Sequence, residues 1–215
     1  MFVYAIKNRT RKRSDRAGQE NEAHIMSVLH NPDEMHKMVC ALVSKQGCEK
    51  SFRKEAGILY RVETIGDNVR VIIQSDYPLM EKKIEENGFV IEMLSNFEPD
   101  FKDGETVWLK TSLCPLRRRT DDNGHHYEHL ISTREERLVY VKELLERNGF
   151  APANIEEVAR SCVTMQRKKE NTSWLNSVSD YAVKGRIIDS KLFLDAVKNG
   201  VGRYRSFGCG MLRFV

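Results

Sequence analysis

Glycines and arginines gather near the end of the chain, in the run Gly-Val-Gly-Arg-Tyr-Arg-Ser-Phe-Gly-Cys-Gly at 200–210. Glycine allows unusual backbone angles and a close approach to a ligand, and arginine supplies fixed positive charge. The run follows a predicted helix, whereas a dinucleotide-binding glycine loop leads from a strand into a helix. The sequence therefore excludes a dinucleotide fingerprint and favours contact with a phosphate backbone through Arg203, Arg205 and Gly208. The alternative is a helix cap followed by a tight turn.

His36 is a candidate for proton transfer. On a helical wheel it lies beside the apolar stripe of a predicted helix, so its side chain is half-shielded from water. The pKa of such a histidine is easily moved around neutrality, which suits a general acid or base. One histidine specifies no mechanism, however, so the residue pattern alone favours a boundary histidine without a chemical role.

A histidine-rich run, His125-His126-Tyr-Glu-His129, raises the question of a metal site. Its first and last histidines have the spacing that brings two side chains to one face of a helix. The run follows the turn-rich residues Asp-Asp-Asn-Gly, and no cysteine or second ligand cluster frames it. A structural or catalytic zinc site needs three or four protein ligands. The sequence therefore predicts a loop here, and neither a metal nor another cofactor.

Basic residues are segregated along the chain, although the net charge is only +4. The clusters are Lys7–Arg16, Arg117–Arg119, Arg167–Lys169 and the arginines of the tail. Acids concentrate in other segments. Separate basic clusters favour a polyanionic partner, with a solvated basic surface as the alternative.

Composition indicates a globular chain with room for two domains. It has 215 residues, of which 40% are hydrophobic and 31% charged. Five widely spaced cysteines form no CxxC pair, which is typical of a reduced, cytoplasmic protein. The apolar stretch at the start is too short for a signal peptide or a membrane span, so we expect no membrane association.

The first half of the chain is predicted to position His36 within a βαββαβ unit. Asn31-Pro-Asp-Glu is a strong helix start, and Gly47 is a plausible stop for that helix. Two strand-like runs follow, with Gly66-Asp67-Asn68 between them as a hairpin turn. The expected elements are strands at 2–6, 58–63, 69–75 and 89–94 and helices from 31 and at 79–86.

The second half repeats this order. Thr133-Arg-Glu-Glu forms a capping box for one helix, and Asp189 or Ser190 caps the other, which Gly200 ends. The expected strands lie at 106–111, 155–166, 178–188 and 211–215. The sequence thus predicts an α+β protein with two tandem ferredoxin-like domains, at 1–98 and 104–215. Many RNA-binding modules share this fold, but the fold alone does not determine function.

Three segments resemble the CasE-type CRISPR-associated endoribonucleases, which process pre-crRNA in type I-E Cascade. The segments are Asn31-Pro-Asp-Glu-Met-His36, then Arg134-Glu-Glu-Arg-Leu through Leu-Glu-Arg-Asn-Gly149-Phe, and Gly185-Arg-Ile-Ile-Asp189 with the glycine-rich tail. The resemblance spans nearly the whole chain and is most specific in the tail.

This resemblance implies an RNA-processing enzyme. Members of the family bind the hairpin of each CRISPR repeat, cut at the 3′ base of its stem without a metal, and remain attached to the product. The ribose 2′-OH attacks the adjacent phosphate, leaving a 2′,3′-cyclic phosphate and a 5′-OH. His36 matches the catalytic histidine of the family, and Arg167, Lys168 and Lys169 match the region that contacts the RNA stem. The implied partners are the repeat RNA and other Cascade subunits, including the backbone subunit.

One departure from the family pattern concerns the second catalytic group. Many relatives carry a tyrosine three residues before the histidine, where this chain has Asp33. The candidates for the second group are Lys37, Lys45, Tyr4 and His24. The alternative function is a catalytically silent subunit that binds structured RNA. A small-molecule enzyme on the same scaffold is the third possibility.

Overall fold

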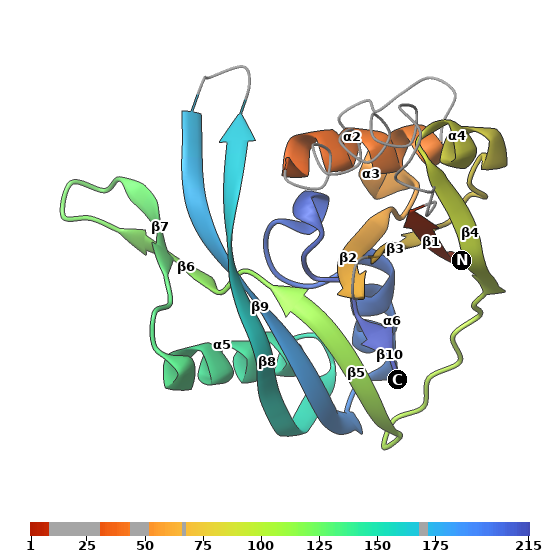
Figure 1. The fold of residues 1–215 in the computed structure, drawn as a ribbon. Coiled ribbons are helices and arrows are strands. Elements are labelled where there is room, and N and C mark those ends of the chain that lie inside the picture. Colours follow the sequence, from red (N-terminus) through yellow and green to blue (C-terminus); the bar gives the residue numbers. More distant parts are fainter. Residues whose placement is uncertain (9–30, 44–51, 66–67, 168–171) are drawn as a thin grey trace. The chain divides into compact units, whose positions relative to one another are not determined.

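The computed structural model describes residues 1–8, 31–43, 52–65, 68–167 and 172–215 (Figure 1). The chain divides into two compact units. The first contains Met1–Glu98, Thr164–Trp174 and Ser206–Gly208, and the second contains Pro99–Val163, Leu175–Arg205 and Cys209–Val215. No helix among the described residues is long and apolar enough to cross a membrane.

The sheet of the first unit is antiparallel, with the strand order β2-β3-β1-β4. Its strands are β1 (Phe2–Asn8), β2 (Leu59–Ile65), β3 (Asn68–Ser75) and β4 (Phe89–Asn96). The helices are α2 (Pro32–Val43), α3 (Phe52–Glu55) and α4 (Glu81–Glu86). Alternate residues of a strand share a face, so Ile6, Val71 and Ile73 pack together with Val39 and Leu42 of α2 in one buried cluster. This packing fixes the helix that carries His36.

The sheet of the second unit has the order β10-β5-β9-β8, which is the same topology. Its strands are β5 (Thr106–Leu113), β8 (Phe150–Arg167), β9 (Thr172–Ile187) and β10 (Arg213–Phe214). Its two helices are α5 (Arg134–Glu146) and α6 (Ser190–Asn199). A short 3-10 helix, η1 (Arg205–Phe207), begins at the last residue of this part of the second unit and continues in the first unit. Two sheets of this order confirm the predicted α+β class with ferredoxin-like topology.

The helices α2, α5 and α6 begin with side-chain caps at the predicted positions. The Oδ1 atom of Asn31 accepts from the backbone N–H of Asp33 at 3.1 Å, at the beginning of α2. Thr133 accepts from the N–H of Glu136 in α5, and Asp189 accepts from two N–H groups in the first turn of α6. Each cap satisfies an N–H group that lacks a partner within its helix. Gly47 and the turn at 66–67 lie outside the described residues.

The expected loop around His125–His129 is wrong. Residues His126–Leu130 form strand β7, which pairs antiparallel with β6 (Leu116–Thr120) in a separate two-stranded sheet. The turn-rich residues before it are the tip of this hairpin, and the arginines 117–119 lie on β6. A half-buried strand is recognised in a sequence by the alternation of apolar and polar residues. This segment is polar at most positions and lacks that alternation, so the sequence did not indicate a strand. We call this hairpin, residues 116–130, the ribbon.

Candidate functional site

His36 lies on α2, little more than one turn after the helix start. Its side chain is half-buried, and its ring nitrogens lie 3.8 and 3.9 Å from the Sγ atom of Cys40, one turn further along. Cys40 is fully buried in the core of the first unit. The histidine therefore has one side against the core and one side accessible, as its place on the helical wheel predicts.

The surroundings of His36 lower its pKa from the ordinary value of 6.5. Burial is the largest cause, because a charged ring loses more hydration than a neutral one. The positive charge of Arg53 lowers the pKa further, and Lys37 adds to this, whereas the carboxylate of Asp33 raises it. At neutral pH the ring is therefore mostly neutral and can accept a proton.

Arg53 is a member of this site that the sequence analysis missed. It lies on the four-residue helix α3, and its NH1 atom donates to the carbonyl of Ile58 at 3.0 Å. That bond anchors the guanidinium at a position from which its charge acts on His36. Its sequence signal is only a basic pair, Arg53-Lys54, because no spacing rule connects this segment to a helix that begins about 20 residues earlier.

The structure describes two of the four residues considered for the second catalytic group, Tyr4 and Lys37. Tyr4 is buried, and its hydroxyl accepts from the N–H of Leu79 at 3.2 Å. Its role is therefore structural, within the core of the first unit. Lys37 is exposed and forms an ion pair with Glu34 at 3.2 Å. Lys45 and His24 lie outside the described residues. Among the described residues, Arg53 has a larger effect on His36 than Lys37 has.

The tail closes the end of α6. Gly200 has a φ of 73° and a ψ of 165°, a backbone conformation open almost only to glycine. The NH1 atom of Arg205 donates to the carbonyls of Asn199 at 2.9 Å and Gly200 at 3.4 Å. Carbonyls at a helix end have no partner within the helix, so the guanidinium caps it and complements its dipole. Arg205, predicted to contact RNA, thus also has a structural task.

Arg203 pairs with an acid on the ribbon. Its NH1 atom contacts Oε1 of Glu128, and the hydroxyl of Tyr204 donates to Oε2 of the same carboxylate at 2.6 Å. Tyr204 has a φ of 57°, which is uncommon for a residue other than glycine. One carboxylate therefore ties two consecutive tail residues to strand β7.

Gly208 lies against Tyr60 within the first unit. Its φ is 83°, and an added Cβ would lie 3.1 Å from Cε2 of Tyr60. The hydroxyl of Tyr60 also donates to the carbonyl of Ser206 at 2.9 Å. A side chain at position 208 would thus meet both an unfavourable backbone conformation and an aromatic ring.

The remaining predicted RNA contacts are Arg167, Lys168 and Lys169. Arg167 is the last residue of β8, and Lys168 and Lys169 lie outside the described residues. The basic cluster after Asn8 lies outside them as well. No group of three or more metal-ligating side chains occurs within the described ranges.

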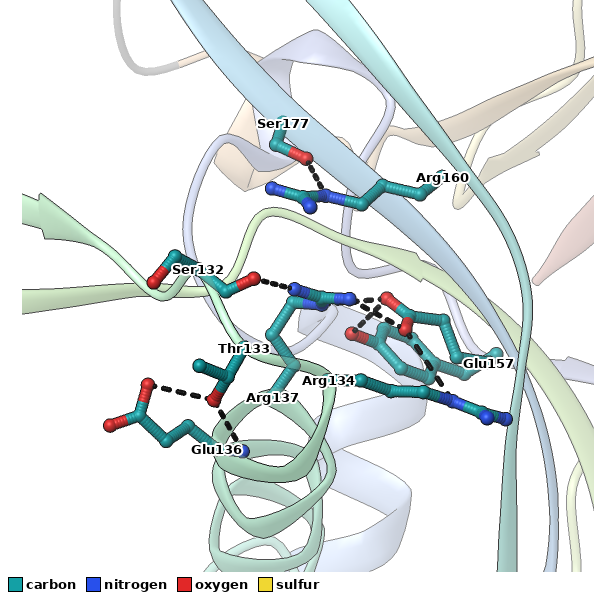
Figure 2. A network of polar contacts seen from close by, with 9 residues as sticks. Ser132, Thr133, Arg134, Glu136, Arg137, Glu157, Arg160 and Ser177 are labelled. Carbon is teal, nitrogen blue, oxygen red and sulfur yellow. Dashed lines mark hydrogen bonds and ion pairs between the residues drawn. The ribbon is translucent and has the colours of Figure 1, made fainter.

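A buried ion pair joins α5 to β8 (Figure 2). Nε and NH2 of Arg137 donate to the two carboxylate oxygens of Glu157 at 2.7 and 2.8 Å, and NH1 donates to the carbonyl of Ser132. Tyr181 donates to Glu157 at 3.4 Å. The hydrogen bonds from Arg137 lower the pKa of Glu157. This network fixes the base of the long β8–β9 hairpin against the helix.

Solved structures match the chain over its whole length. Thermus thermophilus Cse3 bound to an RNA representing a pre-cleavage complex is 18% identical, with 100% of both chains covered and a TM-score of 0.77. CRISPR-associated protein Cas6e from Escherichia coli str. K-12 is 13% identical, with 100% of this chain and 99% of that chain covered and a TM-score of 0.71. A chain of a CRISPR RNA-guided surveillance complex is 17% identical, with the same coverage and a TM-score of 0.65. At these identities the similarity establishes the fold.

A search of the curated proteins found no match. The family model that matches is described as "CRISPR associated protein", and the match runs from residue 3 to residue 214. Because this match spans almost the entire chain and agrees with the fold, the chain belongs to the family of CRISPR-associated proteins.

Proposed function

We propose that the protein is a metal-independent endoribonuclease that binds the hairpin of a CRISPR repeat and cuts pre-crRNA at the 3′ base of the stem. The observation that carries the proposal is His36, half-buried on a capped helix, with its pKa lowered by burial and by Arg53. The RNA bound to the Thermus thermophilus relative represents a pre-cleavage complex, which supports an RNA substrate.

In the proposed reaction the ribose 2′-OH attacks the adjacent phosphorus. The bond from the 2′-oxygen to phosphorus forms and the bond to the 5′-oxygen breaks, which gives a 2′,3′-cyclic phosphate and a 5′-OH. A neutral His36 takes the proton of the 2′-OH as general base, and the leaving 5′-oxygen takes a proton from solvent water. Arg53 offsets the negative charge that develops on the phosphorane. Arg53 thus takes the role of the second catalytic group.

The RNA contacts in this proposal come from the predicted basic residues. Arg167, Lys168 and Lys169 contact the RNA stem, and Arg203, Arg205 and Gly208 of the tail contact the RNA backbone. An arginine has five N–H donors, so Arg203 and Arg205 can keep their internal partners and still face a phosphate. Such contacts release counterions, so affinity falls with salt.

The proposed partners follow from the same family. The protein remains bound to the mature crRNA after cleavage. The proposed domains are 1–98, which carries the catalytic helix, and 104–215, although the segment Thr164–Trp174 of the basic hairpin groups with the first unit. A relative that is part of a CRISPR RNA-guided surveillance complex supports an assembly with other Cascade subunits, including the backbone subunit.

A cleavage assay with a chemically altered substrate tests the proposed reaction. We expect the protein to cut its repeat hairpin in EDTA and to leave a 2′,3′-cyclic phosphate. A hairpin with 2′-deoxyribose at the scissile position should bind equally and stay uncut, because the nucleophile is missing. Cleavage of the deoxy substrate would contradict 2′-OH attack.

The alternative is a silent subunit that binds structured RNA and caps an assembly. Asp33, which stands where many relatives have a tyrosine, is the observation in its favour, because a carboxylate repels a phosphate. Tight binding of the unmodified hairpin without any product after long incubation would support this alternative and contradict the enzyme.

A further inference from the structure

Apart from the contact of Glu128 with the tail, the ribbon formed by β6 and β7 has no part in the site described so far. It leaves the four-stranded sheet of its unit after β5 and reaches away from it (Figure 1). Arginines occupy its three consecutive positions 117–119, and all residues from Arg117 to His129 are exposed. A two-stranded hairpin is marginally stable by itself, so this ribbon needs contacts that hold it.

The register of the ribbon sorts its side chains onto two faces. Arg117 lies opposite His129 and Arg119 opposite Tyr127, and directly opposite residues share a face. We call this face, with Arg117, Arg119, Tyr127 and His129, the outer face. Arg118 lies opposite Glu128 on the other side, which also carries Leu116 and Leu130. We call that side the tail face.

The tail face is fixed to the glycine-rich tail. Leu116 is buried in a cluster with Cys114 and Cys209, and Leu130 and Tyr204 pack against it. The carboxylate of Glu128 accepts from Tyr204 and pairs with Arg203. Tyr204 adopts a left-handed φ that persists only where surrounding contacts impose it. These contacts clamp the ribbon and set which face it turns outward.

The outer face presents positive charge beside an aromatic ring. None of its four residues, all described by the structure, is acidic, and Tyr127 is 46% exposed. The NH2 atom of Arg117 forms an ion pair with Oε2 of Glu143 in α5 at 3.3 Å. One acidic residue of the turn, Asp121, is held by internal hydrogen bonds, because its Oδ1 atom accepts from the N–H groups of residues 123 and 125. The charge of this face therefore complements a polyanion.

We propose that the outer face of the ribbon binds the sugar–phosphate backbone of the RNA, with Glu128 as a positioning residue. Arg117 and Arg119 contact phosphates, and Tyr127 packs on a ribose or an unpaired base. The Arg203 and Tyr204 clamp on Glu128 holds this face toward the RNA. The assignment rests on the proposed function, since it names an additional surface for the same RNA.

Adjacent arginines on opposite faces provide a matched pair of variants. Binding of a fluorescent repeat hairpin is measured at several salt concentrations for R119Q, R118Q and the unaltered protein. R119Q should bind several-fold more weakly, and the slope of log K against log salt should fall by about 0.7 to 0.9 for each phosphate that the variant no longer neutralises. R118Q should retain most of the affinity and slope. Equal effects of the two variants would overturn the assignment.

The variant E128Q tests the positioning role of Glu128. The loss of its negative charge and the loss of its contact with the tail are expected to change the RNA affinity in opposite directions. Removing a negative charge near a polyanion should by itself strengthen binding. Loss of the ion pair with Arg203 should instead loosen the clamp and weaken binding several-fold, with circular dichroism unchanged. Stronger binding by E128Q would overturn the positioning role.

The failures of the two proposals are distinguishable. If the unaltered protein binds no repeat hairpin, both the proposed function and the ribbon assignment fail. If it binds and cuts the hairpin but R119Q behaves like R118Q, only the ribbon assignment fails. Y127F should bind as tightly as the unaltered protein and Y127A more weakly, since stacking needs the ring and not the hydroxyl.

Discussion

At the scale of single residues, the charge state of His36 determines which proton it can move. Burial and the nearby Arg53 both favour the neutral ring, and Asp33 opposes them only in part. A neutral imidazole accepts a proton, so the proposed role is general base. The sequence indicated His36 through its place on the helix, but it could not reveal Arg53. The effect of Arg53 depends on how α3 packs, which no local pattern records.

The pH dependence of cleavage follows from the lowered pKa of His36. A general base works in its deprotonated form, so the single-turnover rate should rise with pH and level off near neutrality. The midpoint should lie below the ordinary histidine pKa of 6.5. A rate that falls with pH over this range would contradict the role as base.

Arg53→Gln should move that profile. Loss of the positive charge removes one cause of the lowered pKa, so the midpoint should shift toward higher pH. The plateau rate should also fall by about 10-fold to 100-fold, because the variant has no cation to place at the phosphorane. Lys54→Gln, which changes the neighbouring exposed residue, is the control. Equal pH profiles for R53Q and K54Q would contradict the assignment.

At the scale of secondary-structure elements, local signals were sufficient for the helices that have polar caps. Asn31, Thr133 and Asp189 each accept a backbone N–H at the predicted start. The ribbon was not predictable in the same way. Between Leu116 and Leu130 both of its faces carry mostly polar and charged residues. Its position depends on the contact between Glu128 and Arg203, which lie 75 residues apart in sequence.

The cap of α2 gives a prediction on stability. Asn31→Ala leaves the N–H of Asp33 without its acceptor, so the free energy of unfolding should fall by about 1 kcal/mol. Asn31→Asp keeps an acceptor and should cost little. Urea denaturation measures both, and an N31A protein as stable as the original would show that the cap contributes nothing.

The ion pair between Arg137 and Glu157 gives a second prediction on stability. Both side chains are buried, at 6% and 7% exposure, so Arg137→Met leaves a buried carboxylate without its main partner. We expect a decrease of about 3 to 5 kcal/mol in the free energy of unfolding, and a smaller decrease when Glu157 is also changed to Leu. An R137M protein no less stable than the double variant would contradict the pairing.

The same pair contributes a pH dependence with a defined sign. Arg137 lowers the pKa of Glu157 below its ordinary value of 4.5. The stability that this shift provides is therefore present above pH 4.5 and is lost as the pH falls through the lower, folded-state pKa. R137M should weaken that pH dependence in acid unfolding curves.

At the scale of the whole molecule, the chain repeats one topology and distributes its tasks between two units. The first unit carries His36 and Arg53, and the second carries the ribbon and most of the tail. The βαββαβ order was predictable because each half has its own helix caps and strand periods. The membership of 206–208 in the first unit was not, because it depends on contacts such as that between Tyr60 and Ser206.

The central claim is that His36 performs the cleavage and that no metal is required. The most direct measurement compares the unaltered protein with His36→Ala on the repeat hairpin in EDTA, with binding measured in parallel. The account predicts that the unaltered protein cuts, whereas H36A binds the hairpin with similar affinity and leaves it intact. Cutting by H36A at the normal rate, or cutting by the unaltered protein only after a divalent metal is restored, would contradict it.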